Sequence, residues 1–260
     1  MKVHFISNER HGIPVPVGIE ETDMVNADIV VVYGGDGTIL RTFGAMSLFG
    51  MFNIPILGIN KGTVGFMAND VVENGGDAFR MLITSTIKKF WKEPNHHIFE
   101  RRSLLDVTLD DRNDRIVVLN EITVHPKDLG KLLDVEVGIQ SLHDSSSVPM
   151  KGDGVIVSTP TGSTAYNLSA GGPILMPHMD AMVVTPLNPF TMAGRSIVLS
   201  KDDNITLKLN DPARVVVDGT EINNASTVNI SFSKDKMILV RANSFFDALQ
   251  TKLGWHRPIK

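Results

Sequence analysis

Hydrophobic residues in the early part of the chain gather in short continuous runs, and each run leads into a glycine-rich segment. The β-branched run at 29–32 and the run at 55–59 are typical of strands buried on both faces. Between them, apolar residues recur from Ile39 to Leu48 at nearly helical spacing, and a helix around 77–85 follows the second run. This alternation predicts a parallel sheet with ligand-binding loops at the carboxyl ends of its strands.

The pattern changes near Pro94, where short strand-like runs follow one another without intervening helices. Turn residues such as Asp218-Gly219 separate these runs. The sequence therefore predicts an antiparallel region, interrupted by one insertion of a loop and a helix near 151–180. The expected strands are 104–109, 115–124, 132–140, 154–157, 196–199, 205–209, 214–217, 227–232 and 236–241.

Together the two patterns predict a Rossmann-like α/β domain at the amino terminus and an all-β, antiparallel, sandwich-like domain at the carboxyl terminus. We expect the α/β domain to cover residues 1–94 and to be completed by a terminal helix within 244–260. The β-rich domain then covers residues 95–243. A chain of 260 residues is long enough to bury a substantial core in such an arrangement.

Composition and charge exclude several classes of protein. The formal charge, 25 − 29 = −4, argues against sequence-independent binding of nucleic acid. Cysteine is absent, which excludes disulfides and thiol catalysis. The segment 154–179 contains no Asp, Glu, Lys or Arg, but its prolines and glycines are incompatible with a helix that crosses a membrane. We therefore expect a cytoplasmic protein without membrane or nucleic-acid partners.

The first candidate site is the sequence Gly34-Gly35-Asp36-Gly37-Thr38, which lies between a predicted buried strand and a predicted helix. Gly34, Gly35, Gly37 and Thr38 would form a phosphate-binding loop, because glycine lets the backbone approach a ligand and a helix start favours anions. The alternative is an ordinary strand-to-helix connection. The dehydrogenase fingerprint is incomplete, since Leu40 replaces its last glycine, and no P-loop motif is present.

The second candidate site is the hydroxyl-rich segment 158–166, in which five Ser and Thr side chains surround Gly162. It ends at Tyr166, one of only two tyrosines, whose ring can contact both a polar ligand and the protein core. The alternative is a Ser/Thr-rich helix cap without a ligand.

These motifs resemble those of a known family. Gly34–Thr38, Asn60–Phe66, Asn120-Glu121 and Asp153–Gly172 are similar, in the same order, to motifs of the bacterial NAD kinases. Lipid kinases and phosphofructokinases carry loops like the first motif, whereas the long last motif is much more specific. One departure is the segment Pro189-Phe190-Thr191-Met192, which lacks a histidine that the family often has there.

The resemblance implies transfer of a phosphoryl group from ATP or polyphosphate to the 2′-hydroxyl of the adenosine ribose of NAD, giving NADP. It implies that Asp36 is the catalytic base and that the β-rich domain binds NAD. The residues that it assigns to NAD binding are Asp36, Gly37, Arg41, Asn120, Glu121, Lys131, Lys151, Asp153, Thr161, Thr164, Ala165, Tyr166, Asn167, Leu168, Ser169 and Asn188.

The resemblance also implies a divalent cation, expected to be Mg²⁺, and a homodimer or homotetramer. Because the sequence contains no dense set of carboxylates, we assign no metal ligands and expect the cation to arrive with the nucleotide. The rival functions are a diacylglycerol-type lipid kinase, which would need an apolar groove, and a non-catalytic NAD(P) sensor, which would not need Asp36. The sequence does not decide between ATP and polyphosphate as the phosphoryl donor.

Overall fold

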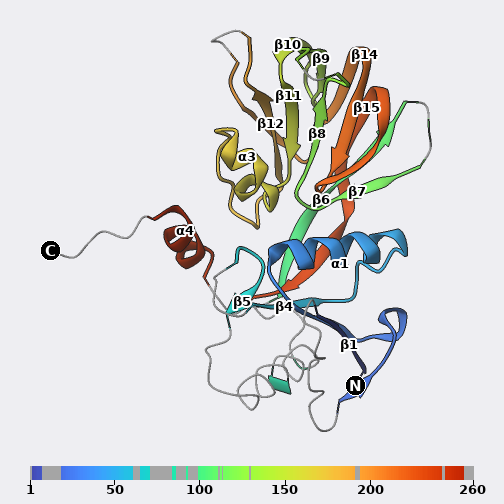
Figure 1. Ribbon diagram of the computed structural model, residues 1–260, viewed down its shortest axis with the longest axis vertical. Coiled ribbons are helices and arrows are strands. Elements are labelled where there is room, and N and C mark those ends of the chain that lie inside the picture. The colour runs from blue at the N-terminus through green and yellow to red at the C-terminus, as the bar shows by residue number, and fades with distance from the viewer. Residues whose placement is uncertain are drawn as a thin grey trace, which may run out of the picture. The chain divides into compact units, whose positions relative to one another are not determined.

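The chain forms two compact units, which two long strands connect (Figure 1). The α/β unit comprises Met1–Arg101 and Met237–Lys260, and the β unit comprises Arg102–Lys236. The structure is a computed structural model. The residues that it describes are 2–7, 19–60, 65–70, 84–85, 92, 99–110, 112, 114–128, 130–190, 194–241 and 244–254. The helix predicted around 77–85 falls almost entirely outside this set.

A parallel sheet forms the centre of the α/β unit, as predicted. Its strands are β1 (Lys2–Ser7), β2 (Glu20–Glu21), β3 (Ile29–Tyr33), β4 (Ile56–Asn60) and β5 (Asn69–Asp70). The order is β2-β1-β3-β4, and β4 also pairs with β5 and with the end of β15 at Leu239. Residues 29–32 are all at most 1% exposed, which explains their continuous β-branched run.

Helix α1 (Asp36–Leu48) connects β3 to β4 and buries Ile39, Phe43 and Met46. Gly58 of β4 gives this helix room, because a Cβ atom there would collide with the side chain of Ile39. The helix therefore packs closely on the sheet, and its first residue, Asp36, is fixed at the carboxyl end of β3. The short 3-10 helix η1 (Met24–Asn26) precedes β3.

Asn69 joins three strands at the carboxyl edge of the parallel sheet. Its side chain is 1% exposed, and Nδ2 donates hydrogen bonds to the carbonyl oxygens of Gly58 (2.9 Å) and Val240 (2.8 Å). These carbonyls belong to β4 and to the end of β15. The amide of one side chain thus links the early part of the chain to a strand that arrives about 170 residues later.

The β unit is mostly antiparallel, which confirms the predicted fold class. Its strands are β6 (Phe99–Leu109), β7 (Ile116–Val118), β8 (Glu121–His125), β9 (Leu133–Gln140), β10 (Ser145–Gly152), β11 (Gly154–Ser158), β12 (Ala181–Leu187), β13 (Ile197–Ser200), β14 (Asn204–Val217) and β15 (Thr220–Val240). They follow the order β13-β12-β11-β8-β14-β15, while β9 and β10 extend the sheet beside the first half of β14. Alternate residues of these strands enclose one apolar core.

Three predicted strand boundaries were wrong. The segment 115–124 forms two strands, because the chain bends at residues 119–120, between Val118 and Glu121. The strands predicted at 205–209 and 214–217 are parts of one continuous strand, β14. Those predicted at 227–232 and 236–241 are likewise parts of β15. A register shift between Lys208 and Ala213 lets β14 continue through residues that the sequence pattern marks as a turn.

Two further strands, β10 and β12, were missed by the sequence pattern. Among the described residues β10 pairs only with β9, and its side chains are largely exposed, so its sequence shows no apolar alternation. β12 is buried along its whole length, but Pro186 interrupts its apolar run and argues against a central strand.

Short helices complete both units. In the β unit, the 3-10 helix η2 (Gly162–Thr164) and α3 (Tyr166–Ser169) lie beside β12 (Figure 1). In the α/β unit, the predicted terminal helix is present as α4 (Phe245–Leu253). The side chain of Ser244 caps it by accepting a hydrogen bond from the backbone N–H of Phe246. Within the described residues, no helix has the length and apolar character needed to cross a membrane.

We expect Asn69→Ala to lower the free energy of unfolding by on the order of 2 kcal/mol, because two buried carbonyl groups lose their donor. Urea titration would measure the loss. Asn204→Ala is the matched control, since Asn204 is exposed at the start of β14 and should change the free energy by at most about 0.5 kcal/mol. Equal effects of both variants would contradict the role assigned to Asn69.

Candidate active site

The first glycine loop holds its shape through close packing between Gly34 and Thr38. The backbone N–H of Gly34 donates to the carbonyl of Ile59 at 2.8 Å, and a Cβ atom at Gly34 would lie 2.6 Å from Oγ1 of Thr38. Gly35 precedes the first turn of α1 in an extended conformation. The loop therefore presents the start of a 13-residue helix, where backbone N–H groups and the helix dipole favour an anion.

The carboxylate of Asp36 binds the segment that follows the second glycine motif. Oδ2 accepts a hydrogen bond from the backbone N–H of Phe66 (2.8 Å), and Oδ1 accepts from those of Met67 and Ala68 (3.0 Å each). Gly65 is needed here, because a Cβ atom at this position would collide with Oδ1. A carboxylate has about four acceptor positions. Among the described residues three of these positions are filled by amides, which leaves Oδ2 with a position to accept one hydrogen from a ligand.

Arg41 places a positive charge one helical turn after Asp36. Its guanidinium lies 3.5 Å from Oγ1 of Thr38, and a Cβ atom at Gly37 would lie 3.7 Å from its Nη1. Both Gly37 and Arg41 are exposed. The structure thus brings Arg41 to the glycine loop, as the resemblance implies. Residues 61–64 of the second glycine motif lie outside the described part of the chain.

In the β unit, Asp218 fixes the predicted pair Asn120-Glu121. The carboxylate of Asp218 accepts hydrogen bonds from three successive backbone N–H groups, those of Leu119 (2.8 Å), Asn120 (2.7 Å) and Glu121 (3.2 Å). The N–H of Asp218 in turn donates to the carbonyl of Glu121 at 3.0 Å. Asp218 and Gly219 both have positive φ, at 49° and 79°, which suits the tight hairpin between β14 and β15.

Burial gives Glu121 and Asp218 unusual protonation behaviour. Burial and the nearby charge of Asp218 raise the pKa of Glu121 to about 8, although the backbone N–H of Tyr166 acts in the opposite direction. Burial raises the pKa of Asp218 to about 6 against the effect of its three amide donors. Oε2 of Glu121 is buried and has no hydrogen-bond partner among the described residues. A ligand that donates a hydrogen bond would satisfy this atom.

The hydroxyl-rich segment packs against the backbone of Asn120. The N–H of Thr159 donates to the carbonyl of Asn120 at 2.9 Å, and Oγ1 of Thr159 donates to the carbonyl of Leu119 at 2.5 Å. A Cβ atom at Gly162 would collide with the backbone of Asn120. This contact explains the glycine at the centre of the segment and places Tyr166 beside Glu121.

Several predicted ligand residues of this segment instead make hydrogen bonds within the protein. Asn167 is fully buried, donates to the carbonyls of Ser163 and Pro173, and accepts from Thr185. Thr161 is 5% exposed and accepts from Arg102 at 3.4 Å. By contrast, Tyr166 is 43% exposed and Ser169 is exposed, while Thr164, Ala165 and Leu168 are half-buried.

Two adjoining cavities of about 350 Å³ each lie on the face of β8 and β14 that is turned away from the core. Glu121 and Tyr166 line the first cavity, and Lys131 and Asp153 line the second. His125 and Arg214 line both. The structure therefore gathers four predicted binding residues, taken from distant parts of the sequence, around these two cavities.

The remaining predicted residues lie at the surface. Lys131 forms an ion pair with Asp128 at 2.8 Å, which raises the pKa of the lysine and lowers that of the aspartate. Lys151 lies 3.4 Å from Asp134. Nδ2 of Asn188 donates to Oδ2 of Asp153 at 2.8 Å, because Asp153 and Asn188 flank the paired strands β11 and β12.

Sequence reasoning missed His125, Arg214 and the role of Asp218. His125 and Arg214 are single polar residues within alternating strands, a pattern that is typical of an ordinary solvent-exposed face. Asp218-Gly219 was interpreted only as a turn. The Asp-Gly pair indicates the hairpin, but nothing in the sequence indicates that the carboxylate reaches residues 119–121.

The α/β unit has a helix start that suits phosphate groups and a carboxylate beside it, and the β unit has a polar cavity with an aromatic side chain. Each of these features is one expected of a nucleotide-dependent phosphotransferase. Two family profiles match the sequence. Residues 10–87 match the ATP-NAD kinase N-terminal domain, and residues 119–242 match the ATP-NAD kinase C-terminal domain.

Curated relatives agree with these matches. An NAD kinase of Bacteroides fragilis is 34% identical over 239 residues, which cover 88% of this chain and 77% of the relative. An NAD kinase of Salmonella dublin is 32% identical over 260 residues, covering 94% and 82%. The chain belongs to the NAD kinase family, and it is a phosphotransferase. This assignment does not favour a lipid kinase or a non-catalytic sensor.

Solved structures share the fold. An NAD kinase from Archaeoglobus fulgidus in complex with ATP has a TM-score of 0.75 and 24% identity, with 99% of this chain and 100% of that chain covered. Yeast NADH kinase complexed with NADH also has a TM-score of 0.75 and 24% identity, covering 93% and 72%. The architecture of an α/β unit followed by a mostly β unit is therefore that of this family.

We expect Glu121→Gln to stabilise the chain increasingly as the pH rises from about 4.5 to about 8. Between its ordinary pKa of 4.5 and its folded value of about 8, Glu121 keeps its proton in the folded chain but loses it on unfolding. The folded chain then binds more protons, so this group makes stability fall with rising pH, whereas glutamine does not titrate. Urea unfolding at several pH values would measure the difference.

The expected gain at high pH is a few kcal/mol, and it should vanish well below pH 4.5, where Glu121 is protonated in both the folded and the unfolded chain. Glu221→Gln, at an exposed carboxylate on β15, is the control and should leave the pH dependence unchanged. Parallel stability curves for Glu121→Gln and the parent chain would show that Glu121 is not held protonated by the fold.

Proposed function

We propose that the chain transfers the terminal phosphoryl group of ATP to the 2′-hydroxyl of the adenosine ribose of NAD and so forms NADP. The observation that carries this proposal is the Asp36 carboxylate, which three backbone amides fix at the start of α1 and whose Oδ2 accepts from only one donor among the described residues. The family assignment supplies the substrates.

In the proposed reaction, Asp36 accepts the proton of the 2′-hydroxyl while the oxygen of that hydroxyl forms its bond to the γ-phosphorus. The bond from this phosphorus to the bridging oxygen breaks, and ADP leaves with the electron pair. Because the transition state is loose, catalysis depends mainly on alignment and on neutralising charge. The start of α1 and the guanidinium of Arg41 are suited to that second task.

A divalent cation accompanies the nucleotide in this proposal. Within the part of the chain that the structure describes, no group of three or more His, Asp and Glu side chains is arranged to hold a metal. This fits an ion, Mg²⁺ in our proposal, that is held chiefly by the donor phosphates. Such an ion would neutralise the charge of those phosphates.

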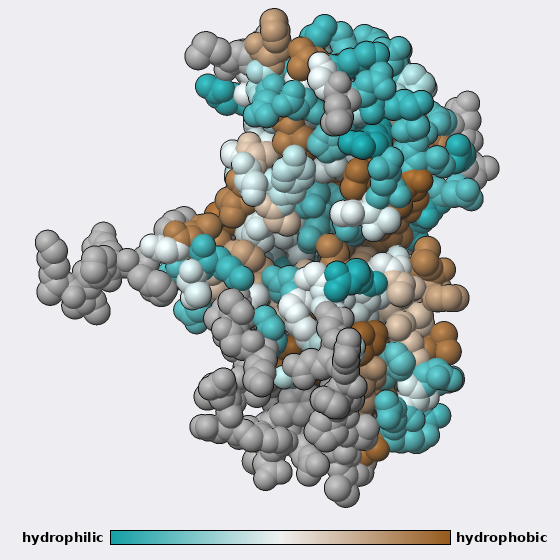
Figure 2. Space-filling model, in the orientation of Figure 1, coloured by the Kyte–Doolittle hydropathy of each residue, from teal (hydrophilic) through white to brown (hydrophobic). Residues whose placement is uncertain are grey.

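The β unit supplies the proposed NAD-binding residues. Glu121 lines the first cavity, where a ribose hydroxyl could donate to its carboxyl group. Tyr166 presents an exposed ring on which a base or a nicotinamide could stack. Asn120, Asp153 and Ser169 extend this set, as do Lys131, Lys151 and Asn188 at the surface. Figure 2 shows that the visible face of the β unit is mostly hydrophilic, which suits a polar ligand.

Incubation with NAD, ATP and Mg²⁺ followed by an assay for NADP tests the proposed function, and the absence of NADP would refute it. A parallel reaction with polyphosphate in place of ATP tests the donor. Homo-oligomerisation and a cytoplasmic location remain part of the proposal. Sedimentation analysis would measure the first.

We expect Asp36→Asn to lower kcat by about 10²–10⁴-fold while the affinity for NAD changes by only a few-fold. Asparagine retains the size of aspartate but cannot accept the proton. It also replaces one acceptor oxygen with a donor that faces backbone N–H groups, so the melting temperature should fall. Steady-state kinetics, NAD titration and thermal unfolding would separate these effects.

Arg241→Lys is the control for the loop itself, because Arg241 also holds the segment after Gly65, through the carbonyl of Phe66. This variant should lower the melting temperature yet reduce kcat by less than about tenfold. If both variants reduce kcat equally, Asp36 acts by fixing the loop and is not the base.

We expect Tyr166→Ala to raise the KM for NAD, since contacts between an aromatic side chain and a base contribute about 1–3 kcal/mol. Tyr166→Phe should change KM much less if the ring stacks on the ligand. An unchanged KM in a folded Tyr166→Ala protein would instead favour a purely structural role for the hydroxyl-rich segment.

A further inference from the structure

Arg214 occupies the junction of the two cavities on the β unit. Arg214 and His125 line both cavities. The two residues lie opposite each other in the antiparallel pair of β14 and β8. No sequence motif includes either residue. The two cavities therefore share one guanidinium group in their lining.

The charge of Arg214 is only loosely compensated. Its Nε atom is buried and has no hydrogen-bond partner among the described residues. Its Nη1 lies 4.0 Å from Oε2 of Glu221, which is too long for a hydrogen bond. Lys131, the other cation of the second cavity, is paired with Asp128 at 2.8 Å. Arg214 is thus better able than Lys131 to bind an anion.

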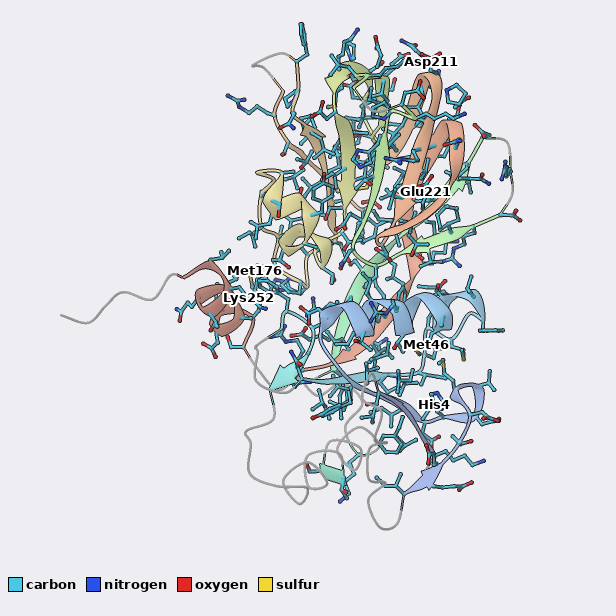
Figure 3. The ribbon with its side chains drawn as sticks, in the orientation of Figure 1. His4, Met46, Met176, Asp211, Glu221 and Lys252 are labelled. Carbon is cyan, nitrogen blue, oxygen red and sulfur yellow. The ribbon has the colours of Figure 1, made fainter. Side chains whose placement is uncertain are left out.

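The register of the strands shows which way the guanidinium extends. Arg214 pairs with His125, while Val216, two residues further along β14, pairs with both Thr123 and Glu221. Because Nη1 approaches Glu221 of β15, the side chain of Arg214 extends along β14 and toward β15, which pairs with β14 on the side opposite β8 (Glu221 is labelled in Figure 3).

Each cavity is lined by two carboxyl groups, of which Glu221 in the first lies near Arg214 and Asp128 in the second pairs with Lys131. The other two, Glu121 and Asp153, can accept from a hydroxyl. Glu121, which is 9% exposed, lines the first cavity, and its Oε2 is buried without a hydrogen-bond partner among the described residues. Asp153 lines the second. The arrangement is an acceptor, a cation and another acceptor in sequence. A dinucleotide has the complementary arrangement, with a hydroxylated ribose on each side of an anionic pyrophosphate.

We propose that Arg214 binds the pyrophosphate of the dinucleotide, with one nucleoside in each cavity. This inference rests on the proposed function and adds a binding residue to it. Arginine suits the position because its planar group can donate two parallel hydrogen bonds to phosphate oxygens. The rival interpretation is a surface ion pair between Arg214 and Glu221 with no role in binding.

The test compares Arg214→Gln with the parent chain by titration calorimetry, using NAD, ADP-ribose and adenosine as ligands. Loss of a charge-assisted hydrogen bond to phosphate should weaken NAD and ADP-ribose by about tenfold or more. Adenosine has no phosphate, so its affinity should stay within about twofold. Lys208→Gln is the matched control, since it removes one positive charge from an exposed position on β14 outside both cavities and should change none of the affinities.

Glu221→Gln separates binding from a structural ion pair. If Arg214 binds pyrophosphate, removing its counter-charge should leave NAD affinity unchanged or increase it, whereas a structural pair predicts the same loss in both variants. Unchanged NAD affinity in Arg214→Gln, or an equal loss for adenosine, would overturn the inference. If the parent chain forms NADP and this result is obtained, only the inference fails. If the parent chain neither binds NAD nor forms NADP, the proposed function fails.

Discussion

Hydrogen bonds from three successive backbone amides to the carboxylate of Asp218 determine the arrangement of the β unit's candidate site. They hold Leu119 and Asn120, which connect β7 to β8, and Glu121, the first residue of β8. The carbonyl of Asn120 is thereby fixed to accept from Thr159, and the segment that carries Tyr166 packs against it. The position of the cavity thus depends on one buried carboxylate in a hairpin turn.

The same physical solution is found at Asp36 in the α/β unit. There too, one carboxylate accepts hydrogen bonds from three successive backbone amides, and the segment that carries them does not pair with it in a helix or a sheet. In both places a glycine gives the required room, Gly65 beside Asp36 and Gly162 beside Asn120. Loops that must present polar groups to a ligand are made rigid by ionisable side chains rather than by apolar packing.

The sequence was informative where one local pattern had one physical meaning. The run 29–32 and the glycines after it could indicate only a buried strand that leads into a tight loop, and the structure has both. The strand β10 could not be predicted, because an exposed strand shows no apolar alternation. The roles of Arg214 and Asp218 also could not be predicted, since they depend on the pairing of strands that lie about 90 residues apart in the chain. The assigned NAD-binding residues stay predictions.

The division of the chain between the two units affects the order in which they can fold during synthesis. The β unit is one continuous stretch, Arg102–Lys236, and its strands are all available once that stretch has left the ribosome. The α/β unit needs residues from both ends, because β4 pairs with Leu239 and Asn69 bonds to the carbonyl of Val240. The sheet around β4 must therefore wait for residues that are translated about 170 positions later before it is complete, with the edge of β4 exposed in the meantime.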